Sequence, residues 1–464
     1  MRKFYYLLAI VAVAATSCQQ EETYTRTQPE TQNSEIADPQ TRSYEEALAI
    51  AEEALKLVDG EDTRSSNHRV IKRNEGQVVM RPTTRGGETE EEPIMYIFNN
   101  ENDEGFTVVA ANRGVEPIIA VTERGNYTYG EPTGVEPFDK YMDDVVETYS
   151  TIVHPPMVLP DDPIVPNPGF IQDTIQYSHI ERGPFLVTKW GQSGIYGAEA
   201  VNGLAGCGPT AIAQIMAYYQ YPKGEIELTY GISSQTITLN WTNILRHYSG
   251  IGTNGTLGWT CLCGCNSGQV ISKLLREIGH RAGATYNNDI LEGDISTSTN
   301  QTQIKNGLVN FGYTASVHSH PTFDMTSWNT HVKSSIISDI SNSRPLIICG
   351  YDNSTNTDTT GHAWVIDGYI KHDSEIDYYT YDPSSNTGTG YVYHHTSERH
   401  YELLHYNWGW NGQCDGWFSY ACYKASEAED YDDTSLNNNI TYNFLIDNEL
   451  IYNIKKPLII NPIW

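Results

Sequence analysis

Six prolines lie within a short stretch of the chain and limit how it can fold. They are Pro155, Pro156, Pro160, Pro163, Pro166 and Pro168. Proline lacks a backbone N–H and holds φ fixed, so such a stretch cannot continue a helix or enter a central strand. It is typical of a stiff, extended linker. We therefore expect a linker over residues 154–182 that joins a small front domain (43–153) to a larger domain (183–464).

The front domain has the pattern of a small α+β unit. Ser43 and Glu46 form a capping box, and apolar residues follow at steps of three and four from Tyr44 to Val58, which predicts a helix. Residues 61–92 are polar and predict a loop. Short apolar runs predict strands, and helical spacing returns afterwards; these segments are Met95–Phe98, Phe106–Ala110, Ile118–Val121 and 138–153. The larger domain mixes helical and strand-like segments without βαβ alternation, so it is also expected to be α+β.

The charge of the chain excludes one broad class of function. The formal net charge is −29 over 464 residues, and residues 19–180 account for −19 of it. Proteins that bind nucleic acids need lysine and arginine to contact phosphates. A general nucleic-acid binder is therefore excluded, and the front part of the chain is expected to be the more acidic.

The first residues have the pattern of an export signal. Arg2 and Lys3 precede an apolar run that is too short for a stable membrane span and ends before Cys18. Ala15 to Cys18 resembles a bacterial lipobox, so residues 1–18 predict either a lipoprotein modified on Cys18 or a secreted protein without lipid. Residues 19–42 predict a disordered tether. Membrane contact is expected only through that lipid, at the outer membrane or cell surface.

Cys207 has the setting of a nucleophile. It lies between Gly206 and Gly208, and Pro209 with the apolar residues that follow predicts a buried helix that begins at or just after it. Backbone N–H groups at a helix N-terminus favour thiolate. A cysteine is, however, more often a small core residue than a catalyst. Whether Cys207 is a nucleophile therefore depends on whether the sequence also supplies the other catalytic groups.

The other cysteines do not predict a metal site. Without Cys18 seven remain, which leaves at least one free thiol in an exported protein. Cys261, Cys263 and Cys265 have a spacing unlike that of zinc ligands, and a surface loop with one disulfide is the favoured interpretation. Cys414 and Cys422 flank a predicted strand, and either pairing or a reduced state is open. No cofactor or metal is expected.

A cysteine hydrolase also needs a base, a group that orients the base, and oxyanion donors. His362 follows Gly361 and precedes a buried strand, 155 residues after Cys207. Asn407 could accept a hydrogen bond from the imidazole, and the Trp408 indole could shield that bond. Gln192 could donate its amide N–H to an oxyanion.

Four segments in this order resemble the streptopain family of secreted cysteine proteases: 183–192, 206–214, 361–368 and 407–410. Residues 105–113 and 117–120 are similar to core strands of that family's inhibitory prosegment. The resemblance implies a papain-like fold behind a removable prosegment, with activation by cleavage in the linker. It implies the following roles: Cys207 as nucleophile, His362 as base, Gln192 as oxyanion donor, Asn407 and Trp408 as the orienting pair, and Gly361 and Ser298 at the substrate cleft.

The predicted function is an exported zymogen of a cysteine endopeptidase, with proteins or peptides as substrates and its own prosegment as inhibitor. Two alternatives stay open. One is a catalytically silent binding or adhesion protein on the same fold, and the other is an amidase or transferase that uses the same cysteine and histidine.

Overall fold

The computed structural model describes residues 41–60, 69–85, 88–151, 170–231, 234–248, 267–289, 294–318, 325–351, 361–382, 384, 390–419 and 449–457. Helices and strands alternate irregularly, which confirms the expected α+β class. Within these ranges no helix has the length and apolarity that a membrane crossing requires. Cys18, Cys422 and the Cys261–Cys265 segment lie outside the described residues, as does the linker over 154–169.

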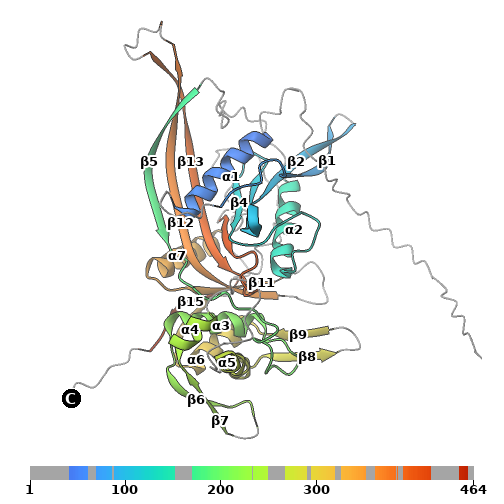
Figure 1. Ribbon diagram of the computed structural model, residues 1–464, viewed down its shortest axis with the longest axis vertical. Coiled ribbons are helices and arrows are strands. Elements are labelled where there is room, and N and C mark those ends of the chain that lie inside the picture. The colour runs from blue at the N-terminus through green and yellow to red at the C-terminus, as the bar shows by residue number, and fades with distance from the viewer. Residues whose placement is uncertain are drawn as a thin grey trace, which may run out of the picture.

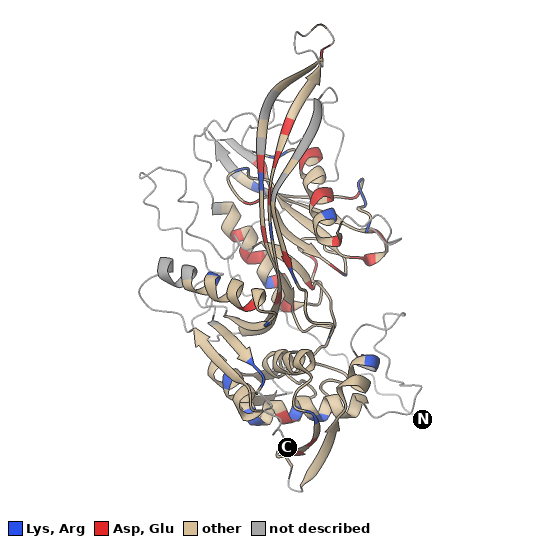
Figure 2. Ribbon diagram, turned by 90° about the vertical axis from the view of Figure 1, so that its left-hand side faces the viewer, with Lys and Arg blue, Asp and Glu red and all other residues tan. Residues whose placement is uncertain are grey.

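The front part of the chain forms two helices and four strands with one short 3-10 helix. The Ser43–Glu46 capping box is present at the start of α1, as the sequence predicts. Acidic residues are frequent along α1 and α2, as the red segments of the ribbon show (Figure 2). The elements are α1 (Tyr44–Asp59), β1 (Gln77–Arg85), β2 (Glu88–Asn99), η1 (Glu101–Asp103), β3 (Phe106–Ala110), β4 (Ile118–Thr122) and α2 (Glu136–Thr151).

The rest of the chain supplies five helices and eleven strands among the described residues. Its elements are β5 (Phe170–Arg182), α3 (Cys207–Tyr219), β6 (Gly224–Leu228), β7 (Gln235–Leu239), α4 (Trp241–Tyr248), α5 (Ser267–Ala282), β8 (Thr285–Asp289), β9 (Asp294–Ser298), α6 (Gln301–Asn310), β10 (Thr314–His318), α7 (Met325–Ser341), β11 (Leu346–Tyr351), β12 (Gly361–Tyr381), β13 (Tyr391–Asn407), β14 (Gly416–Ser419) and β15 (Glu449–Lys455).

One sheet runs through both parts of the chain (Figure 1). Its order is β1-β2-β3-β4-β14-β13-β12-β11-β15-β10, and β5 pairs with β12. The two parts meet where β4 pairs antiparallel with β14, with Val121 opposite Trp417. The front part is therefore joined to the larger part by backbone hydrogen bonds as well as by side chains.

Alternation along the strands divides the core between the two faces of the sheet. Val365 and Ala363 of β12 pack with α3 and α5, whereas Trp364 and Ile366 pack in another cluster with α2 and α7. At the far end of the sheet α1 covers a third cluster. The helix that begins at Cys207 is thus held against the strand that begins beside His362.

Two expectations about irregular segments were wrong. Residues 77–85 and 88–92, expected to lie in a loop, belong to the paired strands β1 and β2, in which Arg81 pairs with Glu92 in register and through an ion pair of 3.2 Å. Cross-strand pairs of opposite charge stabilise a polar hairpin that has little apolar periodicity. Likewise, residues 170–182 of the expected linker form β5, which is hydrogen-bonded along β12 from Thr380 to Tyr369.

Candidate active site

Cys207 is the first residue of α3, as the sequence predicts. Gly206, its N-cap, has a φ of +92°, a region that favours glycine, and a Cβ there would lie 2.7 Å from the Thr297 side chain. The thiol is partly exposed and reduced. Backbone N–H groups of Ala363, Gly208 and Cys207 itself lie close enough to stabilise a thiolate. Since Ala363 follows His362, the fold brings the nucleophile candidate to the strand of the base candidate.

Desolvation and the neighbouring N–H groups act on the pKa of the Cys207 thiol in opposite directions. Burial raises the pKa of Cys207 above its ordinary value, and this effect outweighs the three backbone N–H groups. The N–H groups of Gly208 and Cys207 at the helix N-terminus do favour thiolate, as expected, but desolvation of the charged sulfur is the larger effect in the intact chain.

His362 lies among tryptophan rings. Its ring stacks on Trp364 at 6.1 Å between centroids and meets Trp410 edge-on at 5.4 Å. Its Nε2 lies 2.9 Å from the backbone carbonyl oxygen of Trp408. A carbonyl only accepts, so Nε2 carries the proton and the Nδ1 lone pair is left for another proton. Burial lowers the pKa of His362 to about 4, so the ring is neutral at neutral pH.

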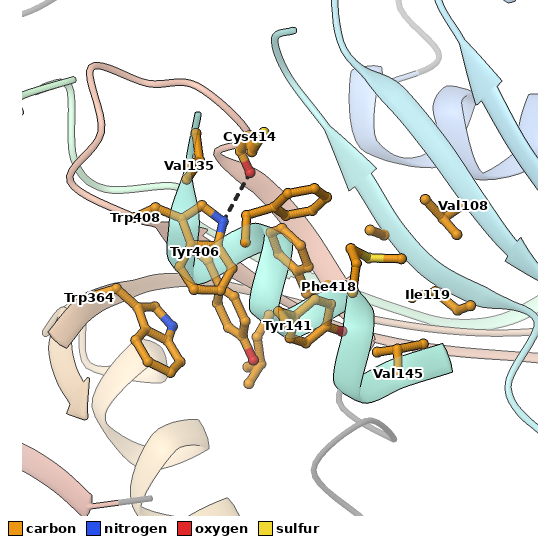
Figure 3. Close-up of a cluster of buried hydrophobic side chains, with 14 of the residues drawn as sticks. Val108, Ile119, Val135, Tyr141, Val145, Trp364, Tyr406, Trp408, Cys414 and Phe418 are labelled. Carbon is orange, nitrogen blue, oxygen red and sulfur yellow. Dashed lines mark hydrogen bonds between the residues drawn. The ribbon is translucent and has the colours of Figure 1, made fainter. Parts of the chain in front are cut away.

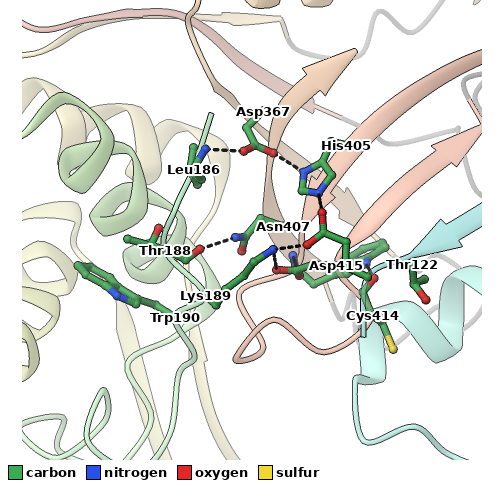
Figure 4. Close-up of polar contacts among 12 residues, drawn as sticks. Thr122, Leu186, Thr188, Lys189, Trp190, Asp367, His405, Asn407, Cys414 and Asp415 are labelled. Atoms are coloured by element: carbon green, nitrogen blue, oxygen red, sulfur yellow. Dashed lines mark hydrogen bonds and ion pairs between the residues drawn. The ribbon is translucent and has the colours of Figure 1, made fainter. Parts of the chain in front are cut away.

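The expected hydrogen bond between Asn407 and the imidazole is not formed. Asn407 is buried; its Oδ1 accepts from Gln214 Nε2 (2.9 Å) and from the Gly409 N–H (3.1 Å), while its Nδ2 donates to the Thr188 carbonyl (2.8 Å; Figure 4). The carbonyl of the next residue, Trp408, takes the place beside His362. Asn407 is held away because its amide is fully used by groups from two other segments.

This buried network links both halves of the site. Gln214 lies two turns after Cys207 on α3, and its Oε1 also accepts from Thr188 Oγ1 at 3.0 Å. Asn407 directly precedes the residue whose carbonyl bonds His362. Sequence reasoning missed Gln214, although a single amide in an otherwise apolar helix is a signal of a buried polar contact.

Gln192 lies beside the start of α3. Its backbone carbonyl accepts from the Ala205 N–H at 2.8 Å, which ties it to the chain two residues before Cys207. Its Nε2 is buried and has no hydrogen-bond partner. An unpaired buried donor costs free energy, and it is what an oxyanion site needs before substrate arrives.

The two residues expected at the substrate cleft, Gly361 and Ser298, are both exposed. Gly361 is exposed at the start of β12. Ser298 is exposed at the end of β9, between Thr297, which packs on Gly206, and Thr299, which packs on Gly208. Ser298 is therefore placed next to the residues that flank the nucleophile candidate.

Cys349 and Cys414 are in the reduced state, and both are buried. Among the residues that the structure describes, no group of three or more histidine, cysteine, aspartate or glutamate side chains could hold a metal ion.

The front part of the chain reaches the site through Trp408. Tyr141 of α2 packs on the Trp408 indole at 6.1 Å and on Phe418 at 5.4 Å, and the indole N–H donates to the Cys414 carbonyl at 3.0 Å (Figure 3). Phe138 adds a contact with Phe418 at 6.3 Å. The Trp408 carbonyl also accepts a hydrogen bond from His362. Trp408 therefore contacts both the docked front part and the candidate site.

Comparisons with known proteins agree with this arrangement. Residues 190–418 match the sequence model of the peptidase C10 family, and residues 35–145 match that of the Spi protease inhibitor. The chain is similar to streptopain of Streptococcus pyogenes, with 25% identity over 357 residues that cover 70% of this chain and 73% of that protein.

Two solved structures from Prevotella intermedia are also similar. One is a fragment of prointerpain A, with 21% identity, a TM-score of 0.45, and coverage of 82% of this chain and 99% of that one. The other is active interpain A, with 21% identity, a TM-score of 0.34, and coverage of 58% and 94%.

The two matched regions follow one another in the order of an inhibitor and its enzyme, and the paired strands β4 and β14 belong to one region each. The chain is a cysteine endopeptidase that resembles the peptidase C10 family over residues 190–418 and has a Spi-type inhibitory prosegment in front of that part.

Proposed function

We propose that this zymogen, once activated, cleaves peptide bonds through a thioester on Cys207, with His362 as the base. His362 Nδ1 takes the thiol proton, and the sulfur attacks the peptide carbonyl carbon. The amine leaves with the proton from the imidazolium. Water then attacks the thioester, again with His362 as base, which releases the carboxylic acid and restores the thiol.

One observation carries this proposal: Cys207 at the N-terminus of α3 faces the backbone N–H of Ala363, the residue after His362. The Trp408 carbonyl supports it, because a bond to Nε2 leaves Nδ1 as the proton acceptor. Asn407 and Gln214 act through the backbone at Trp408 and through α3, and so are positioning residues.

The intact chain is proposed to be silent because both reacting groups are neutral. Burial raises the pKa of the Cys207 thiol and lowers that of His362, so the ion pair does not form at neutral pH. We place the activating cleavage in the linker before β5, since cleavage within β5 requires its pairing with β12 to open. The strand would then stay with the catalytic part.

The function is tested by treating the activated enzyme with an epoxysuccinyl thiol inhibitor and mapping the adduct. We expect cleavage of denatured casein in the presence of reductant, loss of cleavage with the inhibitor, and an adduct on Cys207. An adduct without casein cleavage would favour an amidase or transferase. Neither adduct nor cleavage would favour a silent binding protein.

The same inhibitor, used as a labelled probe, also tests localisation. We propose that the zymogen is exported and either attached by a lipid on Cys18 or released, as the N-terminal pattern predicts. Labelled enzyme is then expected in the cell-surface fraction or in the medium. Label confined to the cytosol would contradict export.

Removal of the Gln192 amide is expected to lower kcat with little change in KM. Gln192→Leu takes away the unpaired buried N–H that we assign to the oxyanion, and loss of one such donor costs about 10²- to 10³-fold in kcat. Steady-state kinetics on a peptide substrate measure the effect. Gln269→Leu, the same change on an exposed position of α5, is the control. An unchanged kcat in Gln192→Leu would remove this residue from the oxyanion site.

A further inference from the structure

One carboxylate of the prosegment enters the catalytic part of the chain. Glu123 follows β4 directly, and its N–H donates to the Asp415 carbonyl at 2.8 Å, which continues the β4–β14 pairing. Its Oε1 lies 3.0 Å from His405 Nε2, and its Oε2 lies 2.7 Å from Lys189 Nζ. The side chain thus bridges two basic groups that belong to different segments of the catalytic part.

The receiving groups are built into the catalytic part. His405 of β13 is 1% exposed, and its Nδ1 lies 2.6 Å from Asp367 Oδ1 (Figure 4). The other oxygen of Asp367 accepts from the Leu186 N–H at 2.7 Å. With a carboxylate at each ring nitrogen, His405 is a donor at both and hence an imidazolium. Lys189 lies 3.6 Å from Asp415 Oδ2 in addition to its bond with Glu123.

We propose that Lys189 and His405 form a carboxylate-binding site of the catalytic part, that Glu123 occupies it in the zymogen, and that this contact makes prosegment binding dependent on pH. The proposal deepens the proposed inhibition by the prosegment and rests on it for its regulatory meaning. Charge-assisted hydrogen bonds to partly buried groups are the stronger kind, and a buried imidazolium left with fewer partners is costly.

The charged groups around His405 are Asp367 on β12, Glu123 after β4, and Asp415 with Lys189 at the near edge. Burial lowers the pKa of His405, but Asp367 and Glu123 together raise it to about 9. When the prosegment leaves, Glu123 leaves with it, so the pKa of His405 falls. The contact between His405 and Glu123 therefore stabilises the docked prosegment fully at pH values below the pKa that His405 has in the open state. This stabilisation is lost as pH rises through about 9.

At acidic pH the contact depends on Glu123, whose pKa is shifted in the opposite direction to that of His405. His405 and Lys189 hold the pKa of Glu123 well below its usual range. Its contribution is present above the ordinary pKa of a glutamate and is lost only as pH falls below that value. The contact is thus expected to be strongest between mildly acidic and neutral pH and to weaken under alkaline conditions.

Opening of the prosegment can be followed on the full chain with Cys207→Ala, which prevents self-cleavage. Cys414 is 1% exposed and lies in the cluster that Val135 and Phe138 of the prosegment complete, so opening exposes it (Figure 3). The rate at which maleimide alkylates the Cys414 peptide, read by mass spectrometry, reports the open fraction. The intrinsic reactivity of the thiol depends on pH, but it is the same in both chains and cancels when the labelling rates of two variants are divided at one pH.

We expect Glu123→Gln to raise the Cys414 labelling rate about 10- to 100-fold near neutral pH, the scale of hydrogen bonds to charged groups. This ratio to the parent chain should fall as pH rises through about 9. Glu104→Gln is the matched control, because Glu104 is an exposed carboxylate whose backbone pairs with Gly125, two residues after Glu123. Its expected ratio is close to one.

A ratio close to one for Glu123→Gln, a ratio that does not change with pH, or an equal effect of Glu104→Gln would overturn the proposal. Lys189→Met gives a second measurement. Because the two side chains contact each other, the double variant Glu123→Gln/Lys189→Met should change the free energy of opening by less than the sum of the two single changes. Failure of the proposed function is distinguishable, because labelling needs no catalysis. In that case Glu123→Gln would still open the chain, but with Cys207 intact it would not hasten the onset of casein cleavage.

Discussion

Cys207→Ala should reduce peptide cleavage by about 10⁶-fold, the scale found when a nucleophile that acts with its base as a unit is removed. The reason is that Cys207 is the thiol of α3 that we assign as the nucleophile, and alanine has no group that can form the acyl-enzyme. The variant should be activated with an added protease, so that loss of self-cleavage does not mask the result. The measurement is kcat/KM on casein and on a chromogenic peptide.

Cys414→Ala is the matched control for this change. Its thiol is also buried, and burial raises its pKa to about 12, so it has no thiolate at neutral pH. The control should keep activity within a few-fold of the parent enzyme. If Cys207→Ala retained more than a hundredth of the parent activity, the nucleophile would have to be sought elsewhere in the chain.

His362→Gln is expected to lower kcat/KM of the activated enzyme by about 10⁴-fold, the upper range for a general base that also protonates the leaving group. The change keeps a polar group beside the Trp408 carbonyl but removes the titratable nitrogen. Alkylation of Cys207 by iodoacetamide should then become slow near pH 6. It should recover only as pH rises above the pKa of an unassisted thiol.

His280→Gln is the control for the histidine change, because His280 is exposed at the end of α5. It should leave both the kinetics and the alkylation profile unaltered. A His362→Gln enzyme that cleaves peptides within tenfold of the parent, with the same dependence of alkylation on pH, would show that another group takes the thiol proton.

Much of the local structure followed from the sequence. The capping box at Ser43, the start of α3 at Cys207 and the strand after His362 are each set by neighbours within a few residues. Such signals act through backbone N–H groups and apolar periodicity, which are readable from a short window. The pairing of β1 with β2 was missed because most of the paired residues are polar, so neither strand shows the apolar alternation by which a strand is recognised.

The sequence predicted which residues lie in the candidate site better than it predicted the hydrogen bonds between them. Asn407 carries the residue type expected of an orienting group, but its amide bonds Gln214 and Thr188. The carbonyl of Trp408 bonds the imidazole instead. A backbone carbonyl is present at every residue and so leaves no trace in the sequence. Only the path of the chain shows which one is used.

The prolines that divide the chain suggested two separate domains, but the structure joins residues of both parts in one sheet and in two shared apolar clusters. The sequence by itself determined where the elements begin and which residue types are available to the site. The tertiary structure decided that β4 pairs with β14, that Glu123 meets Lys189 and His405, and that burial raises the pKa of the Cys207 thiol. These outcomes depend on burial and on pairing between segments that are far apart in the chain, and local patterns contain neither.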